Sequence, residues 1–260
     1  DHTGSTPKYR HALLVEPFTS AAGDSFRPLS SATSSLHAGG IVWYKNYLYV
    51  ADTTNGLRVF DLSRMLAVDT GKKSLAGYDP SGKKFYAYNY KYVIPQMGSY
   101  SLCGGNNCCA RFSFVAADLS YQPDSLLTGE YVKDDTTGRL MRWPLDETTG
   151  RLKVVDGGVQ CSQALYGGVK KMQGAVSVQG RYYISSSETE SIIPPVMDTL
   201  FDGVPGQTVN THEYPYGPED LYYSQWSGLL WTCTEHPEAL LNKRRFCMSV
   251  KLSNVKNGCK

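Results

Sequence analysis

The sequence lacks the features that mark several common functional classes. Its seven cysteines include no C-x-x-C pair and no His-x-x-x-His accompanies them, so the pattern does not favour a zinc site. The 26 basic residues nearly balance the 24 acidic ones, and no apolar run approaches the ~20 residues that span a bilayer. We therefore expect no nucleic-acid partner and no insertion into a membrane.

The motifs of several enzyme classes are also missing. There is no G-x-S-x-G, H-E-x-x-H, P-loop or Rossmann glycine pattern, so serine hydrolases, zinc proteases and nucleotide-binding enzymes lose their usual support. Helical periodicity is short wherever it occurs, and its best candidate, residues 237–245, predicts one or two turns. Because the sequence shows no signal peptide, we expect a cytosolic protein or one supplied in mature form.

What the sequence does contain is a strand–turn–strand pattern that recurs. The clearest copy runs from His37 to Leu62, HAGGIVWYKNYLYVADTTNGLRVFDL, and predicts strands over 40–43, 47–53 and 57–62. Asn-Gly at 55–56 marks a hairpin, since these residues accept a positive φ at little cost. Turns with a Gly for that purpose are expected at 52–58, 134–140 and 146–152.

The recurrence predicts the fold class. Segment 173–187 matches 39–53 in length and in its paired aromatic residues. Units of four strands joined by hairpins are typical of a β-propeller, with a sandwich as the alternative. We therefore predict an all-β fold, a single β-propeller domain over residues 1–260 with four visible blades, or five if the first is incomplete. The expected blades cover residues 37–96, 111–165, 172–213 and 217–252, and the strand at 9–17 is available to complete the last one.

The cysteines favour an oxidising compartment, and hence a secreted, extracellular protein. Cys233 and Cys247 lie near the ends of two segments that should pair as a hairpin, which makes a bridge between them plausible. The remaining cysteines fit a bridge within the 103–109 loop, a further bridge to Cys161 and an unpaired thiol at Cys259. The count is odd, so at least one cysteine is either free or bonded to another piece of chain.

A propeller would gather polar residues that are distant in sequence. The loops before the first strand and after the second strand of each blade share one face, at the mouth of the central channel. Catalytic candidates at this mouth are His37, Tyr216, Glu219 and His236. Binding candidates are Asp52, Arg111, Lys171, Gln173, Tyr214 and Glu235.

Two interpretations of this mouth remain open. His37 with Glu219 or Glu235 could act as base and acid, since one carboxylate beside another raises a pKa toward neutrality. The same polar side chains could instead bind ordered water and tie neighbouring blades together. Each residue taken singly fits the second role better.

Calcium is the one cofactor that the sequence suggests. Glu219 and Asp220 form a carboxylate pair at the channel end of a strand, where they could ligate calcium together with backbone carbonyls. They could equally accept hydrogen bonds from neighbouring strand ends. The other blades place too few carboxylates at equivalent positions, so the pattern favours the second role.

The aromatic content points to a ligand class. Nineteen Tyr and four Trp against eight Phe provide rings with one polar end, which suit both sugar stacking and ordinary sheet edges. We predict recognition or processing of extracellular carbohydrate, in the second case as a polysaccharide lyase or glycoside hydrolase. The alternatives are a lectin or adhesin without catalysis, and a scaffold for a protein partner.

Several segments together resemble a known group. YRHALLVEP, HAGGIVWY, QGAVSV and GPEDL…LLWTCTEHP are similar to secreted propeller-like proteins of Streptomyces and related actinobacteria, from about Tyr9 to Leu252. The resemblance implies secretion and an additional N-terminal segment, and therefore a fifth blade with Asp1 at a cleaved or truncated end. It implies no catalytic residue. The cysteine loop at 103–109 departs from the group's pattern and indicates a different source, such as a eukaryotic one.

Overall fold

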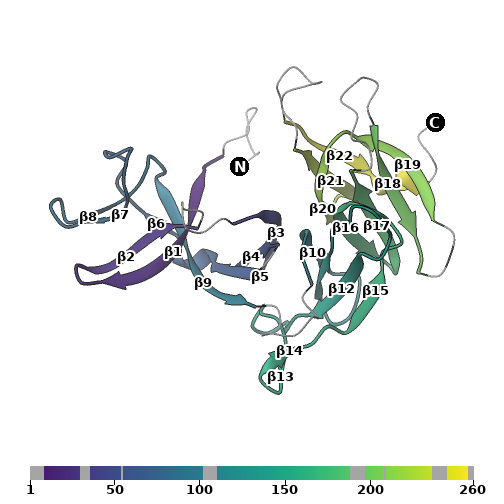
Figure 1. The fold of residues 1–260 in the computed structure, drawn as a ribbon, viewed down its shortest axis with the longest axis horizontal. Helices are drawn as coiled ribbons and strands as arrows, with labels where there is room; N and C mark the ends of the chain where they lie inside the picture. Colours follow the sequence, from purple (N-terminus) through teal and green to yellow (C-terminus); the bar gives the residue numbers. More distant parts are fainter. Residues whose placement is uncertain are drawn as a thin grey trace. The chain divides into compact units, whose positions relative to one another are not determined.

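The computed structural model describes residues 9–29, 36–53, 55–101, 110–187, 197–205, 207, 209–235 and 245–256. The fold is all-β, as the sequence predicts (Figure 1). Over these residues helix is confined to a 3₁₀ turn, Leu62–Arg64, and a short α-helix, α1 (Leu252–Lys256). Neither of these helices has the length or the apolar character to cross a membrane.

The chain divides into two compact units, where the sequence predicted one domain over 1–260. The first unit comprises Asp1–Leu36, Asn46–Leu48 and Arg58–Ser99. The second comprises His37–Lys45, Tyr49–Leu57 and Tyr100–Lys260.

The first unit contains an N-terminal hairpin and further strands. They are β1 (Ala12–Ser20), β2 (Gly23–Pro28), β6 (Leu66–Ala67), β7 (Ala76–Asp79), β8 (Lys84–Ala87) and β9 (Tyr92–Tyr100). β1 pairs antiparallel with β2 and parallel with β9, β6 pairs with β9, and β7 pairs with β8.

The position of β1 corrects the prediction that residues 9–17 complete the last blade. Its partners are β2 and β9, and the sheet that begins at β20 contains no part of it. Two features explain the difference. Residues 23–28, which lie in an expected surface connection, form β2 and give β1 a partner close in sequence. Val15 is fully buried, in a core with Phe26, Ala87 and Val93.

The strands predicted around Asn55-Gly56 are confirmed. They are β3 (Ala38–Tyr44), β4 (Tyr47–Asp52) and β5 (Gly56–Asp61), and the residues of β4 and β5 are divided between the units. In the sheet the order is β2-β1-β9-β5-β4-β3. Gly56 has a φ of +101°, which accounts for glycine at this turn.

The second unit also holds three further sheets whose strands follow one another in sequence, and a small hairpin. The first of these sheets is β10 (Phe114–Asp118), β11 (Ser125–Gly129), β12 (Arg139–Pro144) and β15 (Gln163–Tyr166). The second is β16 (Met172–Val178), β17 (Arg181–Ser186), β18 (Met197–Gly203) and β19 (Asn210–Pro215). The third is β20 (Pro218–Ser224), β21 (Leu229–Thr234) and β22 (Cys247–Lys251), and the hairpin pairs β13 (Val154–Val155) with β14 (Gly158–Val159).

Glycine serves different purposes in the two remaining predicted turns. Gly150 has a φ of +75°, as a hairpin Gly should. Gly138 does not have a positive φ; instead, a Cβ at this position would lie 2.9 Å from the backbone oxygen of Glu130. The prediction for 134–140 is therefore right about the turn and wrong about the reason for its glycine.

The edge strand β3 and the first strands of the three further sheets, β10, β16 and β20, meet along the interior of the second unit. β3 contacts β10 and β20, and β16 contacts β10 and β20 as well. The approach is close enough to require glycine: a Cβ on Gly174 would lie 2.6 Å from the backbone nitrogen of Leu221. A Cβ on Gly39 would lie 2.0 Å from the backbone oxygen of Ser113.

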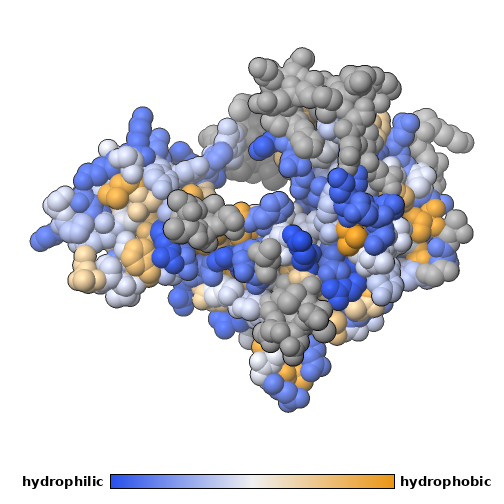
Figure 2. Space-filling model, in the orientation of Figure 1, coloured by the Kyte–Doolittle hydropathy of each residue, from blue (hydrophilic) through white to orange (hydrophobic). Residues whose placement is uncertain are grey.

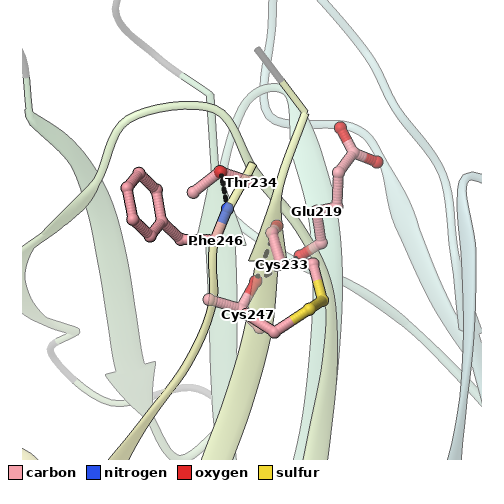
Figure 3. Close-up of a disulfide and its surroundings, with 6 residues drawn as sticks. Glu219, Cys233, Thr234, Phe246 and Cys247 are labelled. Carbon is pink, nitrogen blue, oxygen red and sulfur yellow. Dashed lines mark hydrogen bonds between the residues drawn. A yellow bond between two sulfur atoms is a disulfide. The ribbon is translucent and has the colours of Figure 1, made fainter. Parts of the chain in front are cut away.

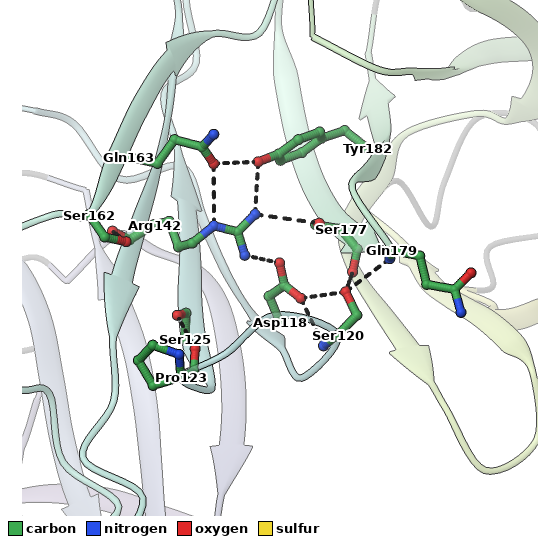
Figure 4. A network of polar contacts seen from close by, with 10 residues as sticks. All are labelled: Asp118, Ser120, Pro123, Ser125, Arg142, Ser162, Gln163, Ser177, Gln179 and Tyr182. Atoms are coloured by element: carbon green, nitrogen blue, oxygen red, sulfur yellow. Dashed lines mark hydrogen bonds and ion pairs between the residues drawn. The ribbon is translucent and has the colours of Figure 1, made fainter.

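A buried arginine ties together the two four-stranded sheets, β10 to β15 and β16 to β19 (Figure 4). The side chains of Arg142 and Asp118 are 3% and 0% exposed and form an ion pair. Arg142 Nη2 donates to the Tyr182 hydroxyl at 2.8 Å, and that hydroxyl donates to Gln163 Oε1 at 2.8 Å. Burial opposes the charge on Arg142, but Asp118 and Tyr182 outweigh it and raise the pKa of Arg142.

Removing the charge of Asp118 should therefore be costly. We expect Asp118→Asn to lower the free energy of unfolding by about 3 kcal/mol, because it leaves the Arg142 charge buried without a carboxylate. Asp135→Asn is the matched control. Asp135 accepts from the backbone N–H and the hydroxyl of Thr137, as Asp118 does from Ser120. Asp135 is exposed, however, and among the described residues it forms no ion pair with a buried arginine. Urea unfolding measures both, and equal losses in the two variants would contradict the prediction.

The close approach of β16 and β20 makes a second prediction. Gly174→Ala should lower the free energy of unfolding by about 1–3 kcal/mol, because the new Cβ would meet backbone atoms of Asp220 and Leu221, which cannot rotate away as a side chain can. Gly158→Ala, whose Cβ meets its nearest atom at 4.0 Å, is the control and should change stability little. A Gly174→Ala protein as stable as the control in thermal unfolding would show that these strands are not closely packed.

Candidate functional site

A carboxylate joins the first and last of the interior strands. Asp220 on β20 is half-buried, and its Oδ2 accepts a hydrogen bond from the backbone N–H of Ile41 on β3 at 3.0 Å. Its Oδ1 accepts from the N–H of Leu221 at 2.9 Å. Burial raises the pKa of Asp220 well above its usual range, although these two N–H groups oppose the rise. Asp220 thus accepts hydrogen bonds from neighbouring strand ends, which is the role that the sequence pattern favours.

β3, β10 and β16 run in the same direction, which brings their starting residues to one end of the second unit. Gly39 lies against Ser113 and Gly40 lies against Val115, so β3 and β10 lie side by side in the same direction. The Ser113 hydroxyl donates to the Met172 carbonyl at 3.1 Å, which sets β16 at the same level. The predicted residues at this end are His37, Arg111 and Lys171.

Two glutamates meet where β20 begins and β21 ends. Glu219 precedes Asp220, and Glu235 follows β21 directly, with its N–H donating to the Gly217 carbonyl at 2.8 Å. Their carboxyl groups are hydrogen-bonded to one another. Burial, together with the charge of Glu235, raises the pKa of Glu219 to about 8, while Arg245 opposes the rise. Near neutral pH Glu219 therefore keeps its proton.

The strand ends that carry these glutamates are braced (Figure 3). A disulfide joins Cys233 on β21 to Cys247 on β22, as the sequence predicts. One residue further on, the Thr234 hydroxyl accepts from the N–H of Phe246 at 3.0 Å. The Thr232 hydroxyl donates to the backbone oxygen of Glu219 at 3.2 Å. These contacts hold the backbone on both sides of the glutamate pair.

The predicted residues around β3 and β4 have local partners. His37 is exposed, and its Nδ1 lies 2.8 Å from the hydroxyl of Thr53. Asp52 is fully buried and accepts from the Asn55 side chain at 3.1 Å, so it supports the β4–β5 turn. Of these two, His37 is the one whose side chain reaches solvent.

Near Arg111 the structure reveals a residue that the sequence analysis missed. Glu130 follows β11, and its Oε1 accepts from the Arg111 N–H at 3.1 Å. Its carboxylate also receives the Arg139 guanidinium, with Nη2 at 2.6 Å. Burial raises the pKa of Glu130, but Arg139 and the backbone N–H groups outweigh it and lower the value overall. An acid at or directly after the end of a second strand, as with Asp52 and Glu235, is the signal that could have identified it.

The other predicted residues have different surroundings. Lys171 is half-buried with a φ of +49°, and its N–H donates to the Val132 carbonyl at 2.8 Å. The Gln173 amide donates to the Ser187 hydroxyl at 3.1 Å. Tyr216 is half-buried, and His236 lies outside the described residues.

Tyr214 does not offer an open ring for stacking. It is 6% exposed and belongs to a core with Val176, Leu200 and Leu221. Burial raises the pKa of its hydroxyl. Tyr214 faces inward from β19, so this binding candidate is a core residue.

The described residues contain no group of three or more His, Cys, Asp or Glu side chains arranged to hold a metal ion. Both oxygens of Asp220 accept backbone N–H groups, and the Glu219 carboxyl is bonded to Glu235. The carboxyl groups of Glu219 and Asp220 are therefore hydrogen-bonded to other groups of the same chain, which does not support the calcium interpretation.

Comparison with known proteins finds no matching family model and no matching curated protein. Among solved structures, the chain is similar to glutaminyl cyclase from Myxococcus xanthus, with 10% identity over 94% of this chain and 75% of that one, at a TM-score of 0.40. It is also similar to the Dos1 propeller, with 11% identity over 87% and 68% of the two chains, at a TM-score of 0.34. Scores this low carry no argument about sheet arrangement or activity.

The glutamate pair predicts how stability depends on pH. Because the pKa of Glu219 rises on folding from its usual 4.5 to about 8, the folded state binds the proton more tightly than the unfolded state. Stability should therefore fall as the pH rises from about 4.5 to about 8, and Asp220 acts in the same direction. Glu219→Gln should reduce this fall.

Urea midpoints at pH 5, 7 and 8.5 measure the effect. The control is Glu213→Gln, which changes an exposed glutamate on β19 and should leave the pH dependence unaltered. A Glu219→Gln protein whose stability falls as steeply as that of the parent would contradict the raised pKa of Glu219.

Proposed function

We propose that the sheets beginning with β3, β10, β16 and β20 are blades of a β-propeller, and that the end where these strands start binds extracellular carbohydrate. The support for the blades is the cyclic order of contacts, β3 to β10 to β16 to β20 and back to β3. The Cys233–Cys247 disulfide supports an oxidising, extracellular setting.

The observation that carries the ligand class is the Glu219–Glu235 pair. A carboxyl group and a carboxylate side by side offer one hydrogen-bond donor and several acceptors. Neighbouring hydroxyls of a sugar need that combination, because each hydroxyl both donates and accepts. The exposed ring of His37 and the half-buried ring of Tyr216 add polar and stacking surface near the same strand ends.

Processing of the carbohydrate is the second candidate, and the pKa of Glu219, about 8, is the observation that favours it. Glycoside hydrolases separate their two carboxyl groups by roughly 5–9.5 Å, whereas Glu219 and Glu235 are directly hydrogen-bonded. The pair is thus better suited to moving a single proton, as a lyase does, than to hydrolysis with two separate carboxyl groups.

The scaffold alternative receives less support. In the view of Figure 2, hydrophobic residues form small separate groups among hydrophilic ones over the coloured, described part of the surface. A surface that binds a protein partner usually presents a broader apolar patch.

A panel of glycans and polysaccharides tests the proposal. We expect the protein to bind at least one oligosaccharide, and Glu235→Gln to weaken that binding about tenfold by removing the charged acceptor. Glu213→Gln is the matched control and should bind as the parent does. Unsaturated products would select the lyase candidate, and the absence of both binding and turnover across the panel would overturn the proposal.

A further inference from the structure

The outer strand of the last sheet has an edge that no described strand occupies. The two preceding sheets of the second unit each have four strands, and the last sheet has β20, β21 and β22. β21 pairs with one side of β22. Residues Cys247, Ser249 and Lys251 on β22 are all exposed, which shows that this strand lies at the surface.

The hydrogen-bond pattern shows which backbone groups point away from β21. The Thr234 N–H donates to the Phe246 carbonyl at 2.8 Å, and the Leu252 N–H donates to the Gly228 carbonyl at 3.0 Å. In an antiparallel pair these bonds recur at every second residue. Met248 and Val250 therefore bond to β21, whereas the N–H and C=O groups of the three exposed residues, Cys247, Ser249 and Lys251, point to the open edge.

A mainly apolar cavity of about 550 Å³ lies beside the same strand. Met197, Tyr214, Met248, Val250 and Val255 line it together with polar residues that include His212, Glu213 and Ser249. Met248 and Val250 are half-buried, and they share the face of β22 opposite to that of the exposed residues. A strand added at the open edge would place its own alternate side chains next to this cavity.

We propose that this edge pairs antiparallel with β22 of a second copy of the chain, which joins the two last sheets into one. A two-fold axis at Ser249 places Ser249 opposite its counterpart and Met248 opposite Val250 of the second copy. Lys251 then faces Cys247 of the second copy, a disulfide-bonded and uncharged residue, so no like charges are opposed. Both Met248–Val250 pairs lie on the cavity side, where they extend its apolar lining.

Sedimentation velocity over a range of concentrations tests the pairing. We expect a reversible dimer, and Ser249→Pro should raise its dissociation constant about tenfold or more, because each copy loses an N–H that points to its partner. The hairpin with β21 should persist, since that N–H is not bonded to β21. Ser249→Ala keeps the N–H and should dimerise as the parent does.

A charge exchange keeps the test decisive if Ser249→Pro fails to fold. Ser249→Lys and Ser249→Asp would each place like charges opposite one another and should weaken their own dimers. Mixed together, the two variants should associate more tightly than either does alone. A protein that stays monomeric at all concentrations, a dimer that survives Ser249→Pro, or a mixture without recovered association would overturn the proposal.

Discussion

The interior of the second unit depends on a carboxylate placed among backbone donors. Asp220 receives the N–H of Ile41 from β3 and the N–H of Leu221 from its own strand. Gly40 and Gly174 leave the space that its atoms occupy, since a Cβ on Gly40 would lie 2.4 Å from Asp220 Oδ2. This contact joins the first and last sheets of the unit. It thereby fixes the position of the strand ends that hold the candidate site.

Three acids of the second unit show how surroundings assign different roles to the same functional group. Asp118 is fully buried and pairs with Arg142, which makes it a structural anchor. Glu130 is nearly as buried, and Arg139 keeps it ionised. Glu219 is buried beside a second carboxyl group, and Arg245 offsets their effect only in part, so Glu219 retains a proton near neutral pH. Chemistry is expected at the last of these, because its charge state is the one that a ligand or a pH change can alter.

The last sheet combines this site with two other features of β21 and β22. The disulfide between Cys233 and Cys247 braces the end that carries Glu235. The edge of β22 away from β21 exposes backbone N–H and C=O groups and borders the mainly apolar cavity. Because the glutamate pair lies at one end of the sheet and the open edge lies along its outer side, the proposed ligand and the proposed second copy would use different groups of the same sheet.

Local pattern alone determined the strands 40–43, 47–53 and 57–62, the turn at Gly56, the all-β class and the Cys233–Cys247 bridge. Alternating apolar residues, a positive-φ glycine and two cysteines on paired strands are properties of neighbouring residues, which a sequence displays directly. Tertiary structure alone decided that β1 pairs with β9, that Tyr214 belongs to the core and that Glu130 pairs with Arg139. The same holds for Glu219 and Glu235, since the raised pKa of Glu219 depends on burial and on a distance between strands that a sequence does not encode locally.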